Sequence, residues 1–460
     1  MGTVYFLLLR VPPDRQGERR GFFDLQSRLQ LGVLFLLAAL AAASMWFYVD
    51  RILVGYQVAD AAVHQRPRGN LSDLYPRWLG ARELLLRQRN PYSDEITREI
   101  QQGYYGRLLD PARPSDPKDQ QGFAYPVYVV FLLAPFIGFP FHPVQVVFYW
   151  TLIGMTAASV WLWLRALRWR LSVVSIAICI ALLLGCFPAV QGIKLQQLSL
   201  LVAALLAGSV ACVSGGLLFC GGTLLALATI KPQLVWPLVL WMLVWSARDW
   251  PGRRKFVFGF GLAMALLLGG AEIILPGWLR MFTQALQQYH RYTQNQSVLL
   301  VPWAFSGIVI AVAAIACGWL LYKLRRVPAD SVNFGLAASL VLALTVLVVP
   351  MYAPYNQVLL LPAILTLVRD RTVLTSRSRG VRFGYVAAAF ALAWQWIASL
   401  GLSAIYLSGA RAWALRAWKW PFFATFTLPV FVFALIFIDV RNTIDVRITL
   451  PVKPKGESQE

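Results

Sequence analysis

The stretch Asp73-Leu-Tyr-Pro-Arg-Trp-Leu-Gly-Ala-Arg-Glu-Leu-Leu-Leu-Arg-Gln-Arg-Asn-Pro-Tyr92 decides how the rest of the chain is interpreted. Its apolar residues recur at helical spacing, which predicts an amphipathic helix that opens on an acidic residue. The Asn-Pro pair at its end stops the helix. The apolar face is formed by Leu74, Trp78, Ala81 and Leu85.

The composition around this polar stretch is that of an integral membrane protein. Hydrophobic residues make up 58% of the 460 residues, and the mean hydropathy is +0.60. Soluble domains are less apolar and more charged. The formal charge of +21 is best explained by basic loops on the cytoplasmic side and a basic outer surface. No zinc-finger spacing, phosphate-binding glycine loop or RNA-binding signature is present, so we expect no nucleic-acid partner.

The cysteines and histidines predict neither a disulfide framework nor a metal site. The five cysteines all lie within apolar segments, where they serve as small core residues. The three histidines, His64, His142 and His290, are scattered along the chain. We therefore expect no metal ligands and no cofactor.

The apolar runs predict an all-α polytopic fold with about twelve transmembrane helices. These runs cover approximately residues 31–50, 143–164, 171–190, 197–213, 216–230, 233–247, 256–275, 303–323, 332–349, 355–369, 384–407 and 421–439.

One further apolar segment, 124–139, decides the orientation. If it crossed the membrane, every later basic cluster would lie outside, against the positive-inside rule. It is short and contains Pro126 and Pro135, which favours a re-entrant or interfacial segment. Both termini are then cytoplasmic, and the polar loops that hold candidate site residues lie on the outer face.

The chain therefore divides into five parts. We expect a cytoplasmic N-terminal segment at 1–30, a first transmembrane helix at 31–50, and a large outer loop with juxtamembrane helices at 51–142. A helix bundle at 143–439 and a cytoplasmic tail at 440–460 follow. Chemistry belongs on the outer face, and the large outer loop is its natural location.

Two acidic residues of this loop are candidates for a general base. Asp73 could accept a proton from an acceptor hydroxyl, or it could simply cap the helix that follows. Ser72 could provide the cap and leave Asp73 free. Asp60 is the second choice, since it has the character of an ordinary solvated loop carboxylate.

Two lysines lie between apolar runs with little polar padding. Lys231, in Ile230-Lys-Pro232, could bind a phosphate or pyrophosphate or extend to the interface. Lys194 is similar, and the neighbouring amides of Gln196 and Gln197 could hydrogen-bond a sugar or belong to an interfacial loop.

Two further outer segments are polar and aromatic. Residues 352–357 could bind a sugar or anchor helix ends at the interface, through Tyr352, Tyr355, Asn356 and Gln357. Arg416 belongs to a basic, tryptophan-rich patch that suits an anionic lipid phosphate or plain interface anchoring.

The order of these motifs resembles that of the polytopic GT-C glycosyltransferases. The helix from Asp73 to Tyr92 is followed by Phe123-Ala-Tyr-Pro126, then Gln196-Gln-Leu-Ser-Leu-Leu201 and Ile230-Lys-Pro232. The chain looks most like family 87, which includes polyprenyl-phosphate-mannose-dependent mannosyltransferases. A Gln-Gln pair at 196–197 stands where Gly-Gln is usual.

The resemblance implies an inverting hexosyltransferase of the bacterial cell membrane, with a polyprenyl-phosphate sugar, mannose favoured, as donor. It implies that Asp73 is the catalytic carboxylate. Lys231, Lys194 or Arg416 would bind the donor phosphate, and the acceptor would be a lipid, glycan or protein hydroxyl. A lipid phosphate leaves as a modest anion, so we expect no metal requirement.

Two other functions remain open at this point. A flippase or transporter of lipid-linked sugars would use the same basic residues along a path, but no inverted repeat is visible and the polar residues gather on one face. A non-catalytic scaffold would tolerate substitution of Asp73 and Lys231.

Overall fold

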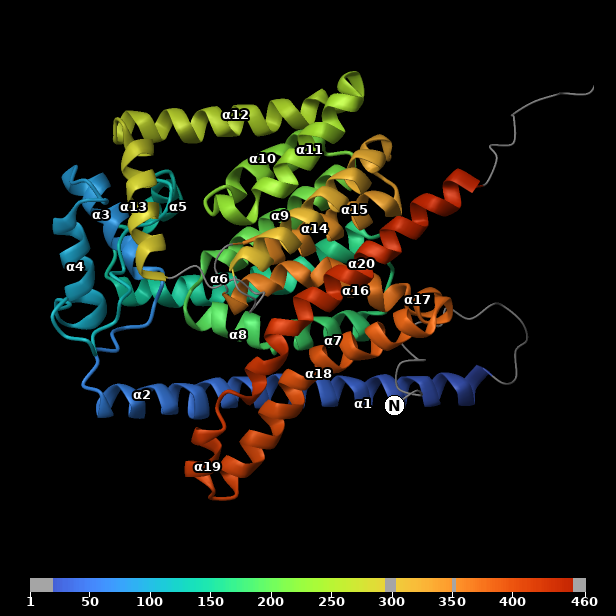
Figure 1. The fold of residues 1–460 in the computed structure, drawn as a ribbon, viewed down its shortest axis with the longest axis horizontal. Coiled ribbons are helices and arrows are strands. Elements are labelled where there is room, and N and C mark those ends of the chain that lie inside the picture. The colour runs from blue at the N-terminus through green and yellow to red at the C-terminus, as the bar shows by residue number, and fades with distance from the viewer. Residues whose placement is uncertain (1–19, 294–302, 350–352, 450–460) are drawn as a thin grey trace, which may run out of the picture.

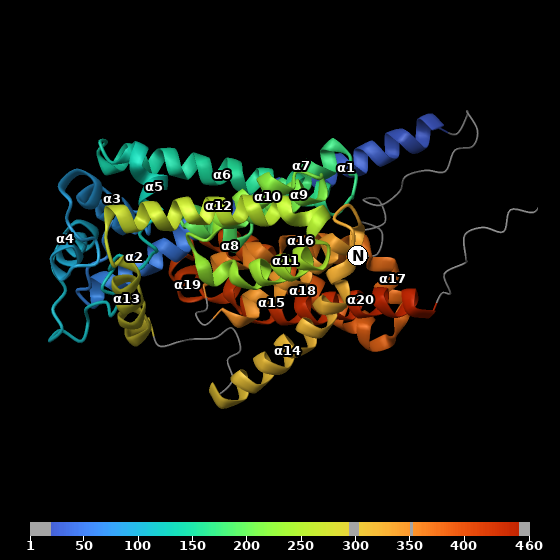
Figure 2. The same cartoon turned by 90° about the horizontal axis from the view of Figure 1, so that it is seen from above.

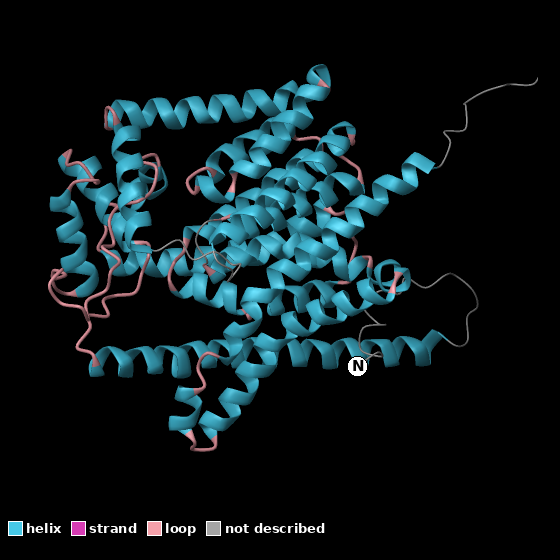
Figure 3. Cartoon of the chain, viewed as in Figure 1, coloured by secondary structure: helices cyan, strands magenta, loops and turns pink. Residues whose placement is uncertain are grey.

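The computed structural model describes residues 20–293, 303–349 and 353–449, and within these ranges all regular structure is helical (Figure 3). In chain order the helices are α1 (Arg20–Phe47), η2 (Tyr48–Leu53), α2 (Val54–Val63), α3 (Tyr75–Arg87), α4 (Asp94–Tyr105), α5 (Val129–Leu133), η3 (Ala134–Phe136), α6 (Phe141–Ala166), α7 (Val173–Leu184), α8 (Phe187–Lys194), α9 (Leu198–Ser214), α10 (Leu218–Ala228), η4 (Pro232–Leu234), α11 (Trp236–Arg248), α12 (Trp250–Ile274), α13 (Trp278–Thr293), α14 (Trp303–Lys323), η5 (Leu324–Arg326), α15 (Val332–Val348), η6 (Pro354–Leu360), α16 (Leu361–Arg369), α17 (Arg371–Arg377), α18 (Arg379–Leu407), α19 (Arg411–Arg416), η7 (Trp420–Phe422) and α20 (Phe423–Thr449).

The helices form a bundle with a cap at one end. The long apolar helices, α1, α6 and α12 among them, run along the horizontal axis of Figures 1 and 2. Helices α3 and α4 lie at one end of this bundle in both views, and α13 stands across the bundle axis there. The site described below lies at this capped end.

Five helical segments of the described chain are long and apolar enough to cross a membrane: Leu29–Val63, Phe141–Ala166, Trp250–Ile274, Arg379–Leu407 and Arg411–Ile444. The pair α7 and α8, bent by 62°, makes a sixth if it counts as one span. The chain is therefore a helical membrane protein.

The other predicted spans also coincide with helices, but several are short. For example, α9 and α15 have 17 residues each. A helix of that length measures about 25 Å, against a hydrocarbon core of about 30 Å. Twelve crossings therefore stay a prediction. Helix α5, with five residues, is far too short to cross.

The predicted amphipathic helix is present as α3 and is anchored by its apolar face. Leu74, Trp78 and Ala81 are buried, whereas Leu85 is only partly buried. The helix ends at Gln88, whose φ of 54° is left-handed, two residues before the Asn-Pro pair. Burial of this face fixes the helix against the bundle, so the residues at its start have a defined position.

Close approach of α10 and α12 stiffens the bundle. A Cβ atom on Gly222 would collide with the backbone of Phe256, and one on Gly259 would collide with the backbone of Phe219. Small residues at such crossings let helix backbones come together in a membrane protein. This contact brings η4 and α11, which follow α10, into a fixed relation to α12.

Candidate active site

A cavity of about 470 Å³ opens at the capped end of the bundle, and we call it the reaction cavity. The outer loop, α13 and the ends of several bundle helices all contribute to it. Its lining residues are Asp73, Arg77, Asp119, Gln121, Gly122, Ala124, Tyr125, Gln197, Lys231, Pro232, Gln233, Trp236, Phe282, Leu286, Tyr289, Val349, Tyr355 and Asn356.

Asp73 is free of any capping role. The helix begins two residues later, at Tyr75, and no side-chain cap hydrogen bond is present. The hydroxyl of Ser72 is buried without a hydrogen-bond partner in the described chain, so it does not cap the helix either. The backbone N–H of Asp73 donates to the carbonyl of Leu195 over 2.9 Å. The carboxylate thus faces the cavity, and the capping interpretation is wrong.

The environment of Asp73 suits a proton acceptor. Burial raises the pKa of its carboxyl group above the ordinary value, because burial penalises the charged form. The positive charge of Arg77, a hydrogen bond from the Gln197 amide, and the charge of Lys231 act in the opposite direction. A carboxylate that is ionised but raised in pKa is a better general base than a solvated one.

Lys231 is held in the wall of the cavity by two hydrogen bonds from its ammonium group. Its Nζ donates to Oε1 of Gln197 over 3.0 Å and to Oγ of Ser199 over 2.5 Å. The ammonium also lies 5.0 Å from the centre of the Tyr355 ring, a distance at which a ring face attracts a cation. Gln197 therefore connects the lysine to Asp73.

Arg77 brings a second cation, partly buried, to the same place. It lies one turn after Asp73, and its guanidinium donates to the Asp73 carbonyl. The guanidinium also lies 4.4 Å from the centre of the Tyr125 ring. Its Nε is buried with no hydrogen-bond partner in the described chain. A buried donor without a partner is costly, and an anionic ligand in the cavity would satisfy it.

A second carboxylate, Asp119, lies at the loop side of the cavity. Its Oδ1 and Oδ2 accept hydrogen bonds of 2.9 and 3.0 Å from the backbone and side-chain amides of Gln121. Burial raises its pKa, and the charge of Asp73 raises it further. Across the described residues, no group of three or more His, Cys, Asp or Glu side chains is placed to share a metal ion.

A comparison of the sequence with known protein families covers many of the residues that line this cavity. Residues 123–350 match the sequence model of glycosyltransferase family 87. The chain belongs to glycosyltransferase family 87. No curated protein and no solved structure matches it.

The chain is thus a glycosyltransferase of the membrane. The matched stretch of this family 87 enzyme supplies the lysine and amide side of the cavity, including Gln197 and Lys231. Asp73, Arg77 and Asp119 precede the matched stretch. The reaction cavity of the glycosyltransferase is therefore composite, with its acidic residues contributed by the segment between α2 and α5 that precedes the matched stretch.

Five of the residues singled out in the sequence meet in the reaction cavity of the glycosyltransferase. They come from the segment before α3, the N-cap of α9, the turn before η4, and η6: Asp73, Gln197, Lys231, Tyr355 and Asn356. Asn356 is tied to the cluster because its Oδ1 accepts a 2.9 Å hydrogen bond from Ser199.

The other predicted phosphate ligands do not line the reaction cavity. The ammonium of Lys194 forms a 2.6 Å ion pair with Asp50 and lies 5.2 Å from the Trp46 ring centre. Arg416 is exposed at the end of α19, at the lower edge of Figure 1, well away from α3 and α13. The second-choice acid, Asp60, is in an ion pair with Arg66 at 3.3 Å on the surface of α2. These three residues lie outside the reaction cavity, and their roles at the site stay predictions.

Two predicted sugar ligands, Gln196 and Gln357, also lie outside the reaction cavity. Their side-chain NH2 groups donate hydrogen bonds to backbone carbonyls. The side-chain NH2 of Gln196 donates to the carbonyls of Ile193 and Lys194, both at 2.9 Å. The NH2 of Gln357 donates to the Thr425 carbonyl over 2.6 Å. Tyr352 lies outside the described residues.

Arg77 and Asp119 are site residues that sequence reasoning missed. Arg77 follows Asp73 by four residues, which is the spacing of neighbours on a helix, so the signal was present. Asp119 follows a proline-rich loop without periodicity, and nothing local marks it.

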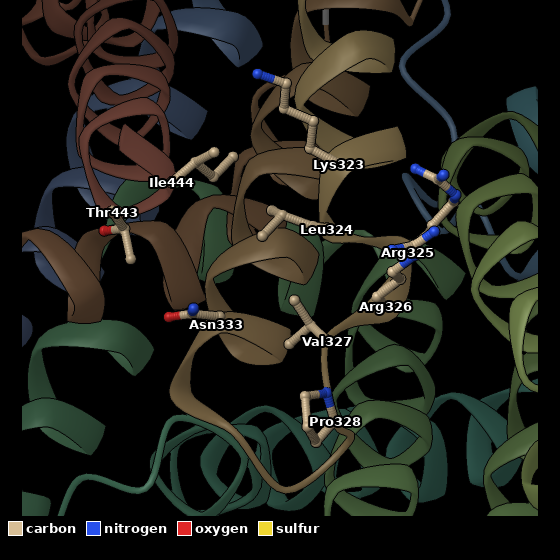
Figure 4. Close-up of a pocket in the computed structure, with 9 residues that line it drawn as sticks. All are labelled: Lys323, Leu324, Arg325, Arg326, Val327, Pro328, Asn333, Thr443 and Ile444. Carbon is tan, nitrogen blue, oxygen red and sulfur yellow. The ribbon is translucent and has the colours of Figure 1, made fainter. Parts of the chain in front are cut away.

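A further cavity, of about 480 Å³, lies between η5 and α20 (Figure 4). Its charged lining residues are all basic: Lys323, Arg325 and Arg326. It lies near the start of α12, since Arg253 donates to the Arg325 carbonyl over 3.0 Å. Without a carboxylate among its lining residues, it offers no general base for glycosyl transfer.

Proposed function

We propose that this glycosyltransferase moves a sugar, mannose in the first place, from a polyprenyl-phosphate donor to an acceptor hydroxyl, with inversion at the anomeric carbon. One observation carries the proposal: the partly buried carboxylate of Asp73 shares a cavity with two cations, the partly buried Arg77 and the buried Lys231. Transfer from a sugar phosphate needs both a base for the acceptor and positive charge for the leaving phosphate.

In the proposed reaction Asp73 takes the proton of the acceptor hydroxyl as its oxygen attacks the anomeric carbon. The bond between that carbon and the phosphate oxygen breaks, and the electron pair leaves with polyprenyl phosphate. In this proposal the Arg77 Nε, which has no hydrogen-bond partner in the described chain, donates to the leaving phosphate. Lys231, which is hydrogen-bonded to Gln197, adds its positive charge. Charge placed in advance at a leaving group lowers the barrier without reorganisation.

The aromatic and amide groups of the cavity suit the sugar itself. Tyr355 and Tyr125 present ring faces, and Asn356 contributes an amide. Sugar rings combine apolar faces with hydroxyl groups, so such a lining can stack and hydrogen-bond at once. We propose that these residues hold the transferred sugar.

We place the enzyme in the bacterial cell membrane, with both termini in the cytoplasm and the reaction cavity on the outer face. The basic loops between helices support this orientation through the positive-inside rule. Membrane lipids surround the bundle, the donor's polyprenyl chain lies among the helices, and the acceptor is a lipid, glycan or protein. No metal or other cofactor enters the proposed reaction.

The proposal is tested with purified full-length protein in detergent, radiolabelled polyprenyl-phosphate mannose and a crude lipid acceptor extract. Release of polyprenyl phosphate by wild type and not by Asp73→Asn is the expected result. Asp60→Asn is the matched control, since it makes the same change at a carboxylate of α2 that does not line the reaction cavity. Equal release by wild type and Asp73→Asn would remove Asp73 from the mechanism.

A further inference from the structure

The basic cavity between η5 and α20 lies at the end of the bundle opposite the reaction cavity, and we call it the basic pocket (Figures 1 and 4). Helix α12 connects the two ends, since its first turns contact η5 through Arg253 and its last residue, Ile274, leads into α13. Its 25 residues correspond to a length of about 37 Å. Thr443 and Ile444, which line the pocket, are the last residues of a candidate membrane span. The basic pocket therefore lies at a boundary of the membrane.

A buried arginine holds the main chain at the wall of the basic pocket. Arg253 is 8% exposed and donates to the Trp245 carbonyl over 2.6 Å. It also donates to the carbonyls of Arg325 and Val327, over 3.0 and 3.2 Å. The indole of Trp245 donates to the same Val327 carbonyl over 2.8 Å. These bonds fix the course of the main chain here without using the side chain of Arg326, which stays available to a ligand.

The positive charge of the basic pocket is not compensated within the described part of the chain. Lys323 and Arg326 are exposed and form no ion pair there. The guanidinium of Arg325 donates to the Tyr322 carbonyl and lies 3.4 Å from the centre of the Tyr322 ring, so it has no anionic partner either. Neighbouring cations without a counter-ion produce a positive potential that favours an anionic ligand.

Asn333 adds a buried polar group that lines the pocket without a partner. The residue is 7% exposed, and its side chain makes no hydrogen bond in the parts of the chain that the structure describes. A buried amide without a partner is costly, and a phosphate oxygen would accept a hydrogen bond from its NH2 group. Asn333 is also the second residue of α15, and the free N–H groups at the start of a helix favour negative charge. In Figure 4 Asn333 and Thr443 lie on one side of the pocket, and Arg325 and Arg326 lie on the other.

A stripe of exposed apolar side chains follows α14 to the basic pocket. Its members recur at spacings of four and three residues along one helix face, and each is at least 54% exposed: Ile308, Val312, Ile315, Trp319 and Tyr322. The stripe ends beside Lys323, whose ammonium lies 3.6 Å from the centre of the Trp319 ring. Figure 2 shows α14 projecting from the edge of the bundle. An acyl chain that lies along this face would place its headgroup at the pocket.

We propose that the basic pocket binds the phosphate group of an anionic membrane phospholipid, with the acyl chains along the apolar stripe of α14. A free phosphate ion has the same charged group, but it would leave the stripe without a ligand. Basic pockets between membrane helices suit lipid headgroups for this reason. The site is independent of sugar transfer. With the orientation proposed above, its lipid belongs to the cytoplasmic leaflet.

Two pairs of substitutions separate a specific site from general attraction between charges. Lys323→Gln/Arg326→Gln removes two charges that line the pocket. Arg254→Gln/Lys255→Gln is the matched control, because it removes one arginine and one lysine charge at the start of α12, where both residues are exposed and neither lines the pocket. Asn333→Leu removes the buried amide at similar volume and leaves every charge in place.

The test uses native mass spectrometry of the full-length protein, purified in a neutral detergent and titrated with phosphatidylglycerol or phosphatidylcholine of identical acyl chains. We expect wild type to bind its first phosphatidylglycerol at least about tenfold more tightly than phosphatidylcholine. Lys323→Gln/Arg326→Gln should weaken phosphatidylglycerol binding about thirtyfold, the effect of two basic groups near a lipid phosphate. Asn333→Leu should weaken it about tenfold, the effect of one hydrogen bond to a charged group. The control pair should change it less than about threefold.

Equal binding of the two lipids by wild type would overturn the proposal, as would equal weakening by the pocket pair and the control pair. Free phosphate as the true ligand is a distinct outcome that would also overturn it. Inorganic phosphate at millimolar concentration would then displace phosphatidylglycerol from wild type and raise the Tm of wild type alone, and we expect it to do neither. Thermal unfolding in detergent verifies that each variant is folded, and the two charge pairs decide the test if Asn333→Leu is not.

Discussion

The hydrogen bond from Gln197 to Asp73 gives a quantitative prediction. Its amide donates to the carboxylate and its Oε1 accepts from Lys231. Gln197→Leu removes both bonds at similar volume. A hydrogen bond to a charged group contributes about 1.5–3 kcal/mol, and one pKa unit corresponds to about 1.4 kcal/mol. Loss of the bond should therefore raise the pKa of Asp73 by about one to two units.

The sign of the pH effect follows from the proposed role of Asp73 as a base. The amide stabilises the ionised carboxylate, so its removal favours the protonated, inactive form. The acid limb of the kcat/KM profile should move to higher pH by about one to two units, and activity should recover in part above it.

The assay is polyprenyl phosphate release across a pH series, for wild type and Gln197→Leu. Gln233→Leu is the control, because it makes the same chemical change in the same cavity at a residue with no hydrogen bond to Asp73. An acid limb that stays in place in Gln197→Leu, or moves to lower pH, would refute the reasoning. So would an equal shift in Gln233→Leu.

Three other predictions concern the same cavity. Lys231→Met should raise the KM for the donor about tenfold or more, because it removes a buried charge from the cavity. Lys194→Met, which lies outside the cavity, should change this KM less than about twofold. Steady-state kinetics at varied donor concentration distinguishes the two. Burial raises the folded-state pKa of Asp73 above its unfolded value, so its ionised form costs stability at pH 7 and that cost disappears at pH values below the unfolded pKa of about 3.9. Asp73→Asn should accordingly match or exceed the wild-type Tm at pH 7, with the difference lost in acid; a lower Tm at pH 7 would contradict this. Transfer should survive treatment with EDTA, and loss of activity that Mg²⁺ or Mn²⁺ restores would show a metal requirement.

The fold was accessible from sequence where periodicity and length are strong signals. The apolar face of α3 predicted its burial, and apolar runs marked the bundle helices. The number of crossings was not accessible in the same way, because helices such as α9 and α15 are apolar throughout but only 17 residues long. An apolar run shows that a helix is buried, and it does not distinguish protein surroundings from lipid.

The sequence predicted the two charged residues in the middle of the cavity, and it did not predict which of their neighbours also line it. Asp73 and Lys231 are charged residues next to apolar segments, where a charge is costly and therefore indicates a functional site. Lys194 has the same signature, but its charge is compensated by Asp50 from another helix. Gln196 and Gln197 are adjacent, yet they face different surroundings, since Gln196 has a φ of 47° and folds its amide back onto the chain. Such long-range pairings and single dihedral angles leave no trace in local sequence.

The tether of Asp73 has a consequence for how this enzyme can change over time. The residue is positioned by a bond between its own N–H and the carbonyl of Leu195. Both groups exist whatever side chain stands at position 195, so mutation there need not displace the Asp73 carboxylate. The position of this carboxylate therefore depends on the course of the main chain, and the side chains of the surrounding loop can change over evolution without moving it.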